Sequence, residues 1–475
     1  MSRLTRRRFL GAGLAATAGA PLASAKKKRP APDQNVLFLV VDGLRPDLGC
    51  YGNADVLSPR IDRLASRGLT MLRAYCQQST ARASRNSTLT GLRPERAGAD
   101  GADFRRFAGD AKTLPERFRE YGYATGSFGR VFDDPHTDAA DSWTLPPHAP
   151  PPPDHGDASW RCPDAPDDEL PDGRAVSAAI QAMRELRGKG LFFLAVGLQA
   201  PRSPFLAPKG YLDLYPKGLI KPTEYPAPPA SAPRFALHGS ETLRRFKDIP
   251  EQGALPDEKA RELIRAYYAS VSYADAQVGR LLDTLDQLEV ADKTTVVLWG
   301  DHGCHLGEHG LWGPATAYEN ALRVPLIVRA PGQRGSGRKT FALTELVDLY
   351  PSLCDLCEVP MPQGLEGAAF TPLFEDPDRL WKRAVFSRQP REIPGVGAGV
   401  GRTMRTSRFR YTEWTAEGSS FRAAEVYDYR EDPHETRNLA PSPQAASLVN
   451  GLAGMLQEGW QVSLPPTDPR GTANS

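Results

Sequence analysis

The sequence predicts an α/β fold: a doubly wound, mostly parallel sheet with a smaller C-terminal α+β subdomain. The main observation is that strand-like segments alternate with segments of helical periodicity from residue 35 to residue 328. The first strand-like segment, 35–41, is an unbroken apolar run, which is typical of a strand buried on both faces. The chain has 475 residues, 40% of them hydrophobic, which is enough for one large core and a smaller second unit.

The predicted elements follow one another in a regular order. A helix opens at Ser58-Pro59, because proline is favoured at the first helical position. The longest helical segment, 257–288, has apolar residues such as Leu263, Tyr267 and Val271 at helical spacing. The predicted helices are 58–64, 113–121, 175–186 and 257–288; the predicted strands are 35–41, 124–128, 191–196, 294–298 and 324–328; the proline-rich segments 146–171 and 200–233 are predicted loops.

The pattern changes near Trp381. Segments 404–413 and 424–429 are predicted to be short antiparallel strands, and a helix is expected near 445–457. The predicted organisation is a signal peptide (1–25), a linker (26–34), an α/β domain (35–380), a C-terminal α+β subdomain (381–465) and a tail (466–475).

The N-terminus resembles a twin-arginine export signal. Arg6-Arg7-Arg8 precedes a weakly apolar run that ends at Ala23-Ser24-Ala25, an A-x-A cleavage site. We therefore expect export through the twin-arginine route to the periplasm or the exterior. The alternative is an N-terminal membrane anchor, for which the run is short and weakly hydrophobic, and the rest of the chain has no stretch apolar enough to span a bilayer. The net charge of +2 gives no case for a nucleic-acid partner or a membrane surface.

The stretch 74–93 (AYCQQSTARASRNSTLTGLR) is the first candidate for chemistry. Small hydroxyl residues, Arg85 and a closing Leu89-Thr90-Gly91 are typical of a loop that runs into a helix. Unpaired amides at a helix N-terminus attract anions, and the guanidinium of Arg85 could bind sulfate or phosphate oxygens in a bidentate manner. The alternative is a polar loop with an ordinary N-cap.

Acidic residues follow two of the predicted strands. Asp42 comes directly after the strand at 35–41, and Asp301-His302 follows the strand at 294–298. Ligands of doubly wound sheets lie beyond the carboxyl ends of the strands, so these groups are expected to converge. Together they would suit a divalent cation, Ca²⁺ or Mg²⁺. The alternative for each aspartate is a turn or cap residue.

Six cysteines are too few for a disulfide scaffold at this length. Cys354 and Cys357 form a C-x-x-C motif on a predicted amphipathic helix, where packing in the core is favoured over redox or metal chemistry.

The sequence resembles the sulfatases, hydrolases of the alkaline-phosphatase-like superfamily, and within them the iduronate-2-sulfatase-like members. The resemblance extends from residue 35 to about residue 440 and implies the fold above, a sulfuric-ester hydrolase site and a divalent metal. Its blocks are VDGLRPDLGCYG, SPRIDRLASRG, GYATGSFGRVF, FFLAVGLQAPRSPF, YYASVSYADAQVGRLLDTLD, GDHGCHLGEHGLWG, VPLIVRAPG, ELVDLYPSLCDLC and VYDYREDPHETRNLA.

The chain departs from the family where the chemistry occurs. In active members the cysteine of C-x-P-S-R is oxidised to formylglycine, the nucleophile, and alignment on Ser84-Arg85 places Ala81 at that position. No formylglycine is therefore expected. Cys76, five residues upstream, lacks the proline and arginine that maturation requires. The other replacements are Ala83 for proline, Gly43 for the second acid, Arg130 for lysine, Asp133 and Arg202 for histidines, and Pro314 for lysine.

Three hypotheses follow from these residues. The first is an exported member of the family with lost or very weak catalysis that keeps an anion pocket around Arg85, Arg130 and Arg202; His305 is a further substrate-binding candidate, and a sulfated carbohydrate or small anionic ester is the expected ligand. The second is an active sulfuric- or phosphoric-ester hydrolase that uses Ser79 or Thr80 as nucleophile. The third is a structural protein that reuses the fold.

Overall fold

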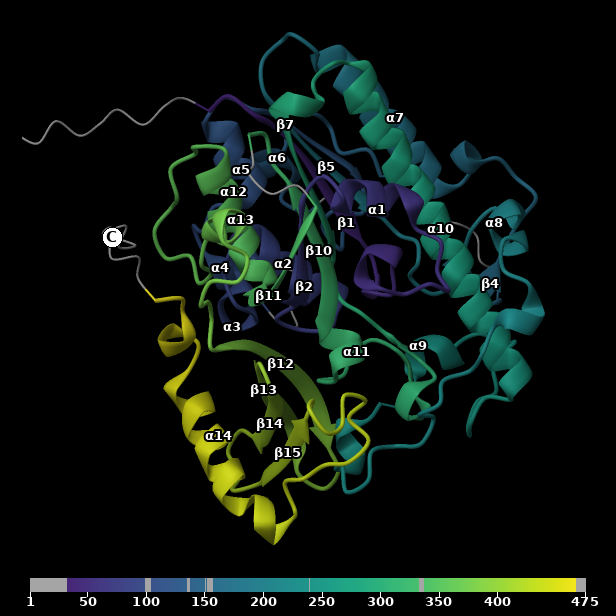
Figure 1. Cartoon of the computed structure of the whole chain (residues 1–475), viewed down its shortest axis with the longest axis vertical. Coiled ribbons are helices and arrows are strands. Elements are labelled where there is room, and N and C mark those ends of the chain that lie inside the picture. Colours follow the sequence, from purple (N-terminus) through teal and green to yellow (C-terminus); the bar gives the residue numbers. More distant parts are fainter. Residues whose placement is uncertain are drawn as a thin grey trace, which may run out of the picture. The chain divides into compact units, whose positions relative to one another are not determined.

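The computed structural model describes residues 32–466 except 99–103, 135–136, 150, 152–156, 239 and 333–336. The predicted signal peptide, most of the predicted linker and almost all of the tail lie outside the described residues. A seven-stranded sheet forms the centre of the described part, and a four-stranded antiparallel sheet follows it in the chain (Figure 1).

The central sheet is mostly parallel, as the sequence predicts. Strand β1 (Asn35–Val41) lies between β5 and β7 and is parallel to both. The exception is β10 (Arg323–Arg329), which runs antiparallel to its two neighbours β2 and β7. The strand order is β11 (Arg338–Glu345), β2 (Leu69–Tyr75), β10, β7 (Thr294–Gly300), β1, β5 (Phe192–Leu198) and β3 (Ala124–Gly129).

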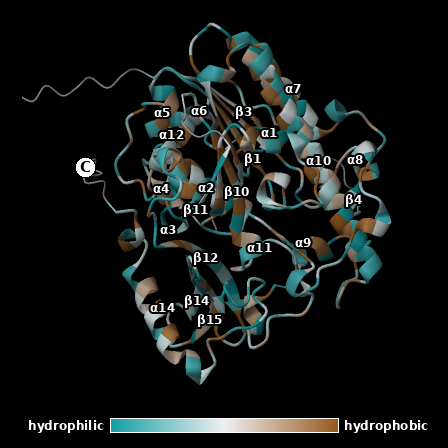
Figure 2. Ribbon diagram, in the orientation of Figure 1, coloured by the Kyte–Doolittle hydropathy of each residue, from teal (hydrophilic) through white to brown (hydrophobic). Residues whose placement is uncertain are grey.

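Helices cover both faces of this sheet. Alternate residues of β1 enter two different hydrophobic cores: Leu37 and Leu39 join one, and Val36 and Phe38 join the other. This is the period-two pattern of a strand buried on both faces, which the apolar run at 35–41 predicted. Figure 2 shows hydrophobic residues along the strands of the central sheet and on the helices beside it.

The predicted helices are present with shifted ends, and the short helices α3, α4, α6, α8, α9, α11 and α13 were not predicted. The C-x-x-C motif lies at the end of α12, where Cys354 and Cys357 are free and buried in the core, as predicted. None of the helices in the described ranges is long and apolar enough to cross a membrane. The helices are α1 (Pro59–Ala65), α2 (Ala81–Thr90), α3 (Pro94–Ala97), α4 (Arg105–Ala108), α5 (Leu114–Glu120), α6 (Ala139–Ser142), α7 (Pro171–Leu186), α8 (Lys209–Asp213), α9 (Glu241–Arg244), α10 (Asp257–Gln287), α11 (Glu319–Leu322), α12 (Leu349–Leu356), α13 (Pro372–Glu375) and α14 (Ala446–Glu458).

Three predictions need correction. The predicted loop at 146–171 contains β4 (Trp160–Arg161) and the start of α7, and the loop at 200–233 contains β6 (Phe205–Leu206), paired with β4, and α8. The segment 404–413 is not one strand, because it spans a turn between two. The C-terminal sheet consists of β12 (Ala384–Ile393), β13 (Gly397–Thr406), β14 (Phe409–Ala416) and β15 (Arg422–Asp428), and a two-stranded ribbon is formed by β8 (His305–Leu306) and β9 (Trp312–Gly313).

The C-terminal sheet packs against the central domain through a buried ion network. Glu345, at the end of β11, accepts hydrogen bonds from Arg93 at 2.8–2.9 Å and from Lys382 at 2.6 Å. Burial opposes ionisation of Glu345, but these two cations outweigh it and lower its pKa to about 2. The network joins the last strand of the central sheet to the segment that leads into β12, close to the carboxyl edge of the sheet.

A buried carboxyl group connects α10 to the start of α1. Oδ1 of Asp275 accepts the backbone N–H of Arg60 at 3.0 Å and of Ile61 at 2.7 Å. Burial raises the pKa of Asp275 to about 7, against the stabilising effect of these two N–H groups. Because this folded-state pKa lies above the unfolded value, the stability that Asp275 contributes is fully present below about pH 4 and is lost as the pH rises through 7.

We therefore predict that Asp275→Asn reduces the pH dependence of stability. The asparagine Oδ1 can keep both hydrogen bonds without a buried charge. The variant is expected to be more stable than the parent by about 1–2 kcal/mol at pH 8 and no more stable at pH 4. Urea unfolding at the two pH values measures this difference, and equal free energies of unfolding at pH 8 would contradict the predicted cost of the charge.

Candidate functional site

The predicted convergence of acidic residues at the carboxyl ends of β1 and β7 is confirmed. Val41 and Gly300, the last residues of these strands, are paired in register, so Asp42 and Asp301 emerge side by side. One potential ligand atom each from Asp42, Asp301 and His302 lies within 4.8 Å of the others, and all three residues are buried. The sheet therefore forms an Asp/His cluster that, by this distance, could hold a metal ion.

Arg85 lies inside this cluster and not at its surface. It belongs to α2, and its side chain is 0% exposed. Its Nε donates to Asp301 Oδ2 at 2.8 Å, and its Nη2 lies 3.1 Å from Asp42 Oδ2. Burial opposes the charge of Arg85, but Asp301 and Asp42 outweigh it and raise its pKa. The expectation that Arg85 offers its guanidinium to a ligand does not hold, because the group is committed to two carboxylates.

Arg130 also binds the carboxylate of Asp42. Its Nη1 donates to Asp42 Oδ2 at 3.0 Å, and its other nitrogens bind the side chain and the backbone carbonyl of Asp133. Asp133 also accepts the Nε of Arg82 at 3.1 Å. Arg202 is half-exposed, and its Nη1 lies 3.8 Å from the same oxygen of Asp42. The predicted group of three arginines thus exists, but two of its members are bound to protein acids.

Few atoms of the Asp/His cluster remain available as ligands for a cation. Asp301 Oδ1 accepts the backbone N–H groups of Gly43 and His302, at 3.0 and 2.8 Å. Asp42 Oδ1 is buried with no hydrogen-bond partner in the described part of the chain, and His302 Nε2 lies 3.7 Å from it. The other imidazole nitrogen, Nδ1, lies 2.9 Å from the Gly303 carbonyl, so a donor there leaves Nε2 as an acceptor.

This donor set does not fit calcium or magnesium. These ions take about six oxygen ligands, whereas one carboxylate oxygen and one imidazole nitrogen remain here. The charge of the cluster also disfavours a divalent cation, because the two positive guanidiniums of Arg85 and Arg130 already balance the two negative carboxylates of Asp42 and Asp301. Gly43 supplies a backbone N–H where a second acid would add an oxygen ligand. The guanidinium groups therefore neutralise the carboxylates that a metal cation would otherwise neutralise at this edge of the sheet.

The residue at the nucleophile position, Ala81, is the first residue of α2 and lines a cavity of about 480 Å³. Thr80 and Arg82 line the same cavity on either side of it. The predicted alternative nucleophile Ser79 lies elsewhere: it is fully buried, and its hydroxyl lies 2.6 Å from the Thr316 carbonyl and 2.9 Å from Gln389 Oε1. Of the two hydroxyl candidates, only that of Thr80 borders the cavity.

The predicted substrate-binding residues Arg202 and His305 both line this cavity. His305 is fully buried, with Nε2 2.9 Å from the Thr316 hydroxyl. Burial, followed by the neighbouring His309 and His238, lowers its pKa well below the usual value, so the ring is neutral at neutral pH. A neutral imidazole can position a ligand by one hydrogen bond, but it offers no charge.

Cys76 does not approach the cluster as a reactive group. It is fully buried, and its thiol lies 3.7 Å from the Ala321 carbonyl. Burial raises the pKa of this thiol, which keeps it protonated and weakly nucleophilic.

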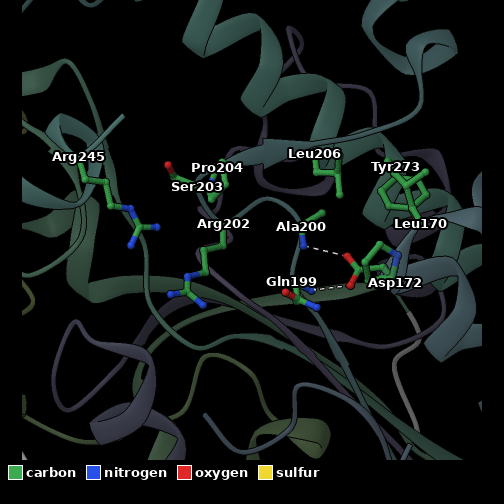
Figure 3. Close-up of a pocket in the computed structure, with 11 residues that line it drawn as sticks. Leu170, Asp172, Gln199, Ala200, Arg202, Ser203, Pro204, Leu206, Arg245 and Tyr273 are labelled. Atoms are coloured by element: carbon green, nitrogen blue, oxygen red, sulfur yellow. Dashed lines mark hydrogen bonds between the residues drawn. The ribbon is translucent and has the colours of Figure 1, made fainter. Parts of the chain in front are cut away.

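Sequence reasoning missed Arg245, which lines the large cavity and a smaller neighbouring one of about 190 Å³. It also missed Asp172, a buried carboxyl group of the small cavity whose pKa is raised to about 6 by burial. Neither residue stands in a motif, and their chain segments meet Arg202 only through the fold. Figure 3 shows these side chains around the small cavity.

Comparisons with known proteins agree with this fold. A family model described as Sulfatase matches residues 34–359, and one described as N-sulphoglucosamine sulphohydrolase, C-terminal, matches residues 307–461. The chain is 33% identical to the iduronate 2-sulfatase of Homo sapiens over 88% of its own length and 93% of that protein's length.

Two solved structures show the same fold. The phosphonate monoester hydrolase of Agrobacterium radiobacter has a TM-score of 0.76 at 20% identity and covers 92% of this chain and 99% of its own. A protein solved with its substrate D-glucosamine-2-N,6-O-disulfate has a TM-score of 0.71 at 20% identity and covers 93% of this chain and 100% of its own.

Proposed function

Because this chain belongs to the sulfatase family, we propose that it is an exported member that binds a sulfated carbohydrate and does not hydrolyse sulfuric esters by the formylglycine route. The observation that carries the proposal is the position of Ala81. Its methyl group borders the large cavity at the start of α2, where the family's nucleophile would stand. A methyl group can neither attack sulfur nor ligate a metal, so the covalent step is lost.

The cavity supports retained binding. Its volume of about 480 Å³ lies in the range of small-ligand sites, and Arg202 and Arg245 on its wall favour an anionic ligand, whereas Arg82 on the same wall is paired with Asp133. The sulfated-sugar ligand comes from the relatives: a neighbouring structure contains a disulfated glucosamine. Export is proposed from the N-terminal sequence alone.

Isothermal titration calorimetry with a heparin-derived tetrasaccharide tests this function. We expect binding in the micromolar to millimolar range, no release of inorganic sulfate and much weaker binding of the chemically desulfated sugar. A matched pair, the parent and Ala81→Cys, should bind alike if the residue matters only for catalysis. Absence of binding at millimolar concentration, or sulfate release by the parent, would overturn the proposal.

A second candidate function is ester hydrolysis with Thr80 as nucleophile. It is favoured by one observation: this residue lines the cavity beside Ala81. Its Oγ1 accepts a hydrogen bond from Gln78 at 3.2 Å. Turnover of a chromogenic aryl sulfate or phosphodiester that disappears in Thr80→Ala would establish this candidate, and turnover that survives would exclude that nucleophile. A structural protein that reuses the fold is favoured if no anion binds.

A further inference from the structure

Two cavities meet beside the Asp/His cluster. Arg202, Ser203 and Arg245 line both the cavity of about 480 Å³ and the one of about 190 Å³, so they form the boundary between the two. In Figure 3 the side chains of Arg202 and Arg245 extend to the same side, and their guanidinium groups point toward one another. The two arginines come from different parts of the chain, the segment after β5 and the residue after α9.

Neither guanidinium has a close acidic partner. Arg245 is exposed and has no carboxylate within ion-pair distance in the described ranges. Its guanidinium carbon lies 4.9 Å from the centre of the Phe246 ring. Among the described residues, Arg202 has one carboxylate within ion-pair distance, Asp42 at 3.8 Å, and that oxygen is already bound by two other arginines. Two like charges that face each other repel, and a shared oxyanion between them removes the repulsion.

The backbone on both sides is held in place. Asp172, at the start of α7, accepts the N–H groups of Gln199 and Ala200 at 2.8 Å each, and the N–H of Arg202 donates to the Gln199 carbonyl at 2.8 Å. Arg245 stands between Leu243 and Phe246, which are both buried. The two arginine side chains thus start from fixed positions, which lowers the entropic cost of binding one group between them.

We propose that Arg202 and Arg245 form a two-arginine subsite for one oxyanion of the ligand, separate from the buried Arg85 and Arg130. The group bound is a sulfate or a uronate carboxylate of a sugar unit that lies across the boundary of the two cavities. Arginine suits either group, because its planar fork matches two oxygens at once. The proposal rests on the proposed carbohydrate-binding function and names the side chains that would recognise the charged group.

The test compares Arg245→Ala, Arg202→Ala, the double variant and the control Arg184→Ala, an exposed arginine of α7 that lines neither cavity. Calorimetry at constant ionic strength uses the heparin-derived tetrasaccharide, its desulfated form that keeps the carboxylates, and a carboxyl-reduced form that keeps the sulfates. Each single variant is expected to weaken binding about ten- to hundredfold, and the control not at all. If both arginines hold one anion, the double variant loses less than the product of the two single losses.

The two modified sugars identify the bound group. If the subsite holds sulfate, the variants lose affinity only for forms that keep sulfate; if it holds carboxylate, only for forms that keep carboxylate. Equal affinity of parent and Arg245→Ala for every sugar would overturn the subsite while leaving the proposed function intact.

A second measurement does not depend on the carbohydrate. Inorganic sulfate should raise the melting temperature of the parent and of Arg184→Ala above that in sodium chloride of equal ionic strength, but not that of Arg245→Ala. An identical sulfate effect in all of these proteins, or none in the parent, contradicts the subsite even if no sugar binds.

Discussion

Replacing Arg85 with methionine is expected to lower the free energy of unfolding by about 3–5 kcal/mol, because it leaves two carboxylates buried without their shared counter-ion. Arg85 is fully buried and binds Asp301 at 2.8 Å and Asp42 at 3.1 Å. Methionine fills much of the same space, so the loss reports on charge more than on a cavity. Urea denaturation at neutral pH measures it.

The matched control neutralises Arg85 and both of its carboxylates, and Arg130 keeps its ion pair with Asp133. In Arg85→Met/Asp42→Asn/Asp301→Asn no charge of the triad remains, and most of the lost stability should return, since a buried ion pair as a whole contributes little compared with neutral residues. A loss below about 1 kcal/mol in the single variant would mean that water or another cation already compensates the two carboxylates.

The second large effect concerns metal ions. The parent protein is expected to keep the same melting temperature in millimolar Ca²⁺, in Mg²⁺ and in EDTA, because Arg85 and Arg130 already neutralise the cluster. Gly43→Asp/Arg130→Lys should acquire cation-dependent stability, since it removes the guanidinium bond from Arg130 to Asp42 and adds a carboxylate. At a cation concentration one hundred times the dissociation constant, the gain is about 2.7 kcal/mol.

The geometry at residue 43 allows this variant. Gly43 has a φ of +73°, a backbone conformation that aspartate tolerates better than most residues, and a Cβ there would meet its nearest atoms at 3.8 Å. Arg130→Lys alone serves as the control and should respond weakly, because the second acid is still missing. A fall in the melting temperature of the parent in EDTA would show that a metal is part of the native protein.

The two replacements at residues 43 and 130 act on the same Asp/His cluster. By the resemblance to the sulfatases, Gly43 stands in place of an acid and Arg130 in place of a lysine, and both residues contact the same cluster. The guanidinium of Arg130 binds Asp42 and Asp133 together, a bidentate geometry that a lysine ammonium does not reproduce. The missing acid makes the cluster less negative, whereas Arg130 keeps the charge of a lysine but binds it to Asp42. Both changes disfavour a cation at this cluster.

Much of the fold was predictable from local sequence. The apolar runs at 35–41 and 294–298, and the helical pattern at 257–288, became β1, β7 and α10 with small shifts at their ends. Strands β2 and β11 were missed, and the antiparallel direction of β10 was not foreseen. The partners that define these strands lie far apart in the chain, and neither alternation nor burial reports the direction in which a strand runs.

By itself, the sequence determined the fold class, the family resemblance, the absence of cysteine at position 81 and the approach of Asp42 to Asp301, because these depend on residue identity and on the ends of parallel strands. Only the tertiary structure decided how the arginines are used. It buries Arg85 between two acids, commits Arg130 to Asp42 and leaves Arg202 facing Arg245. The reason is physical: a long cationic side chain pairs with whichever carboxylates the fold brings within its reach, and that set is fixed by packing between distant segments of the chain.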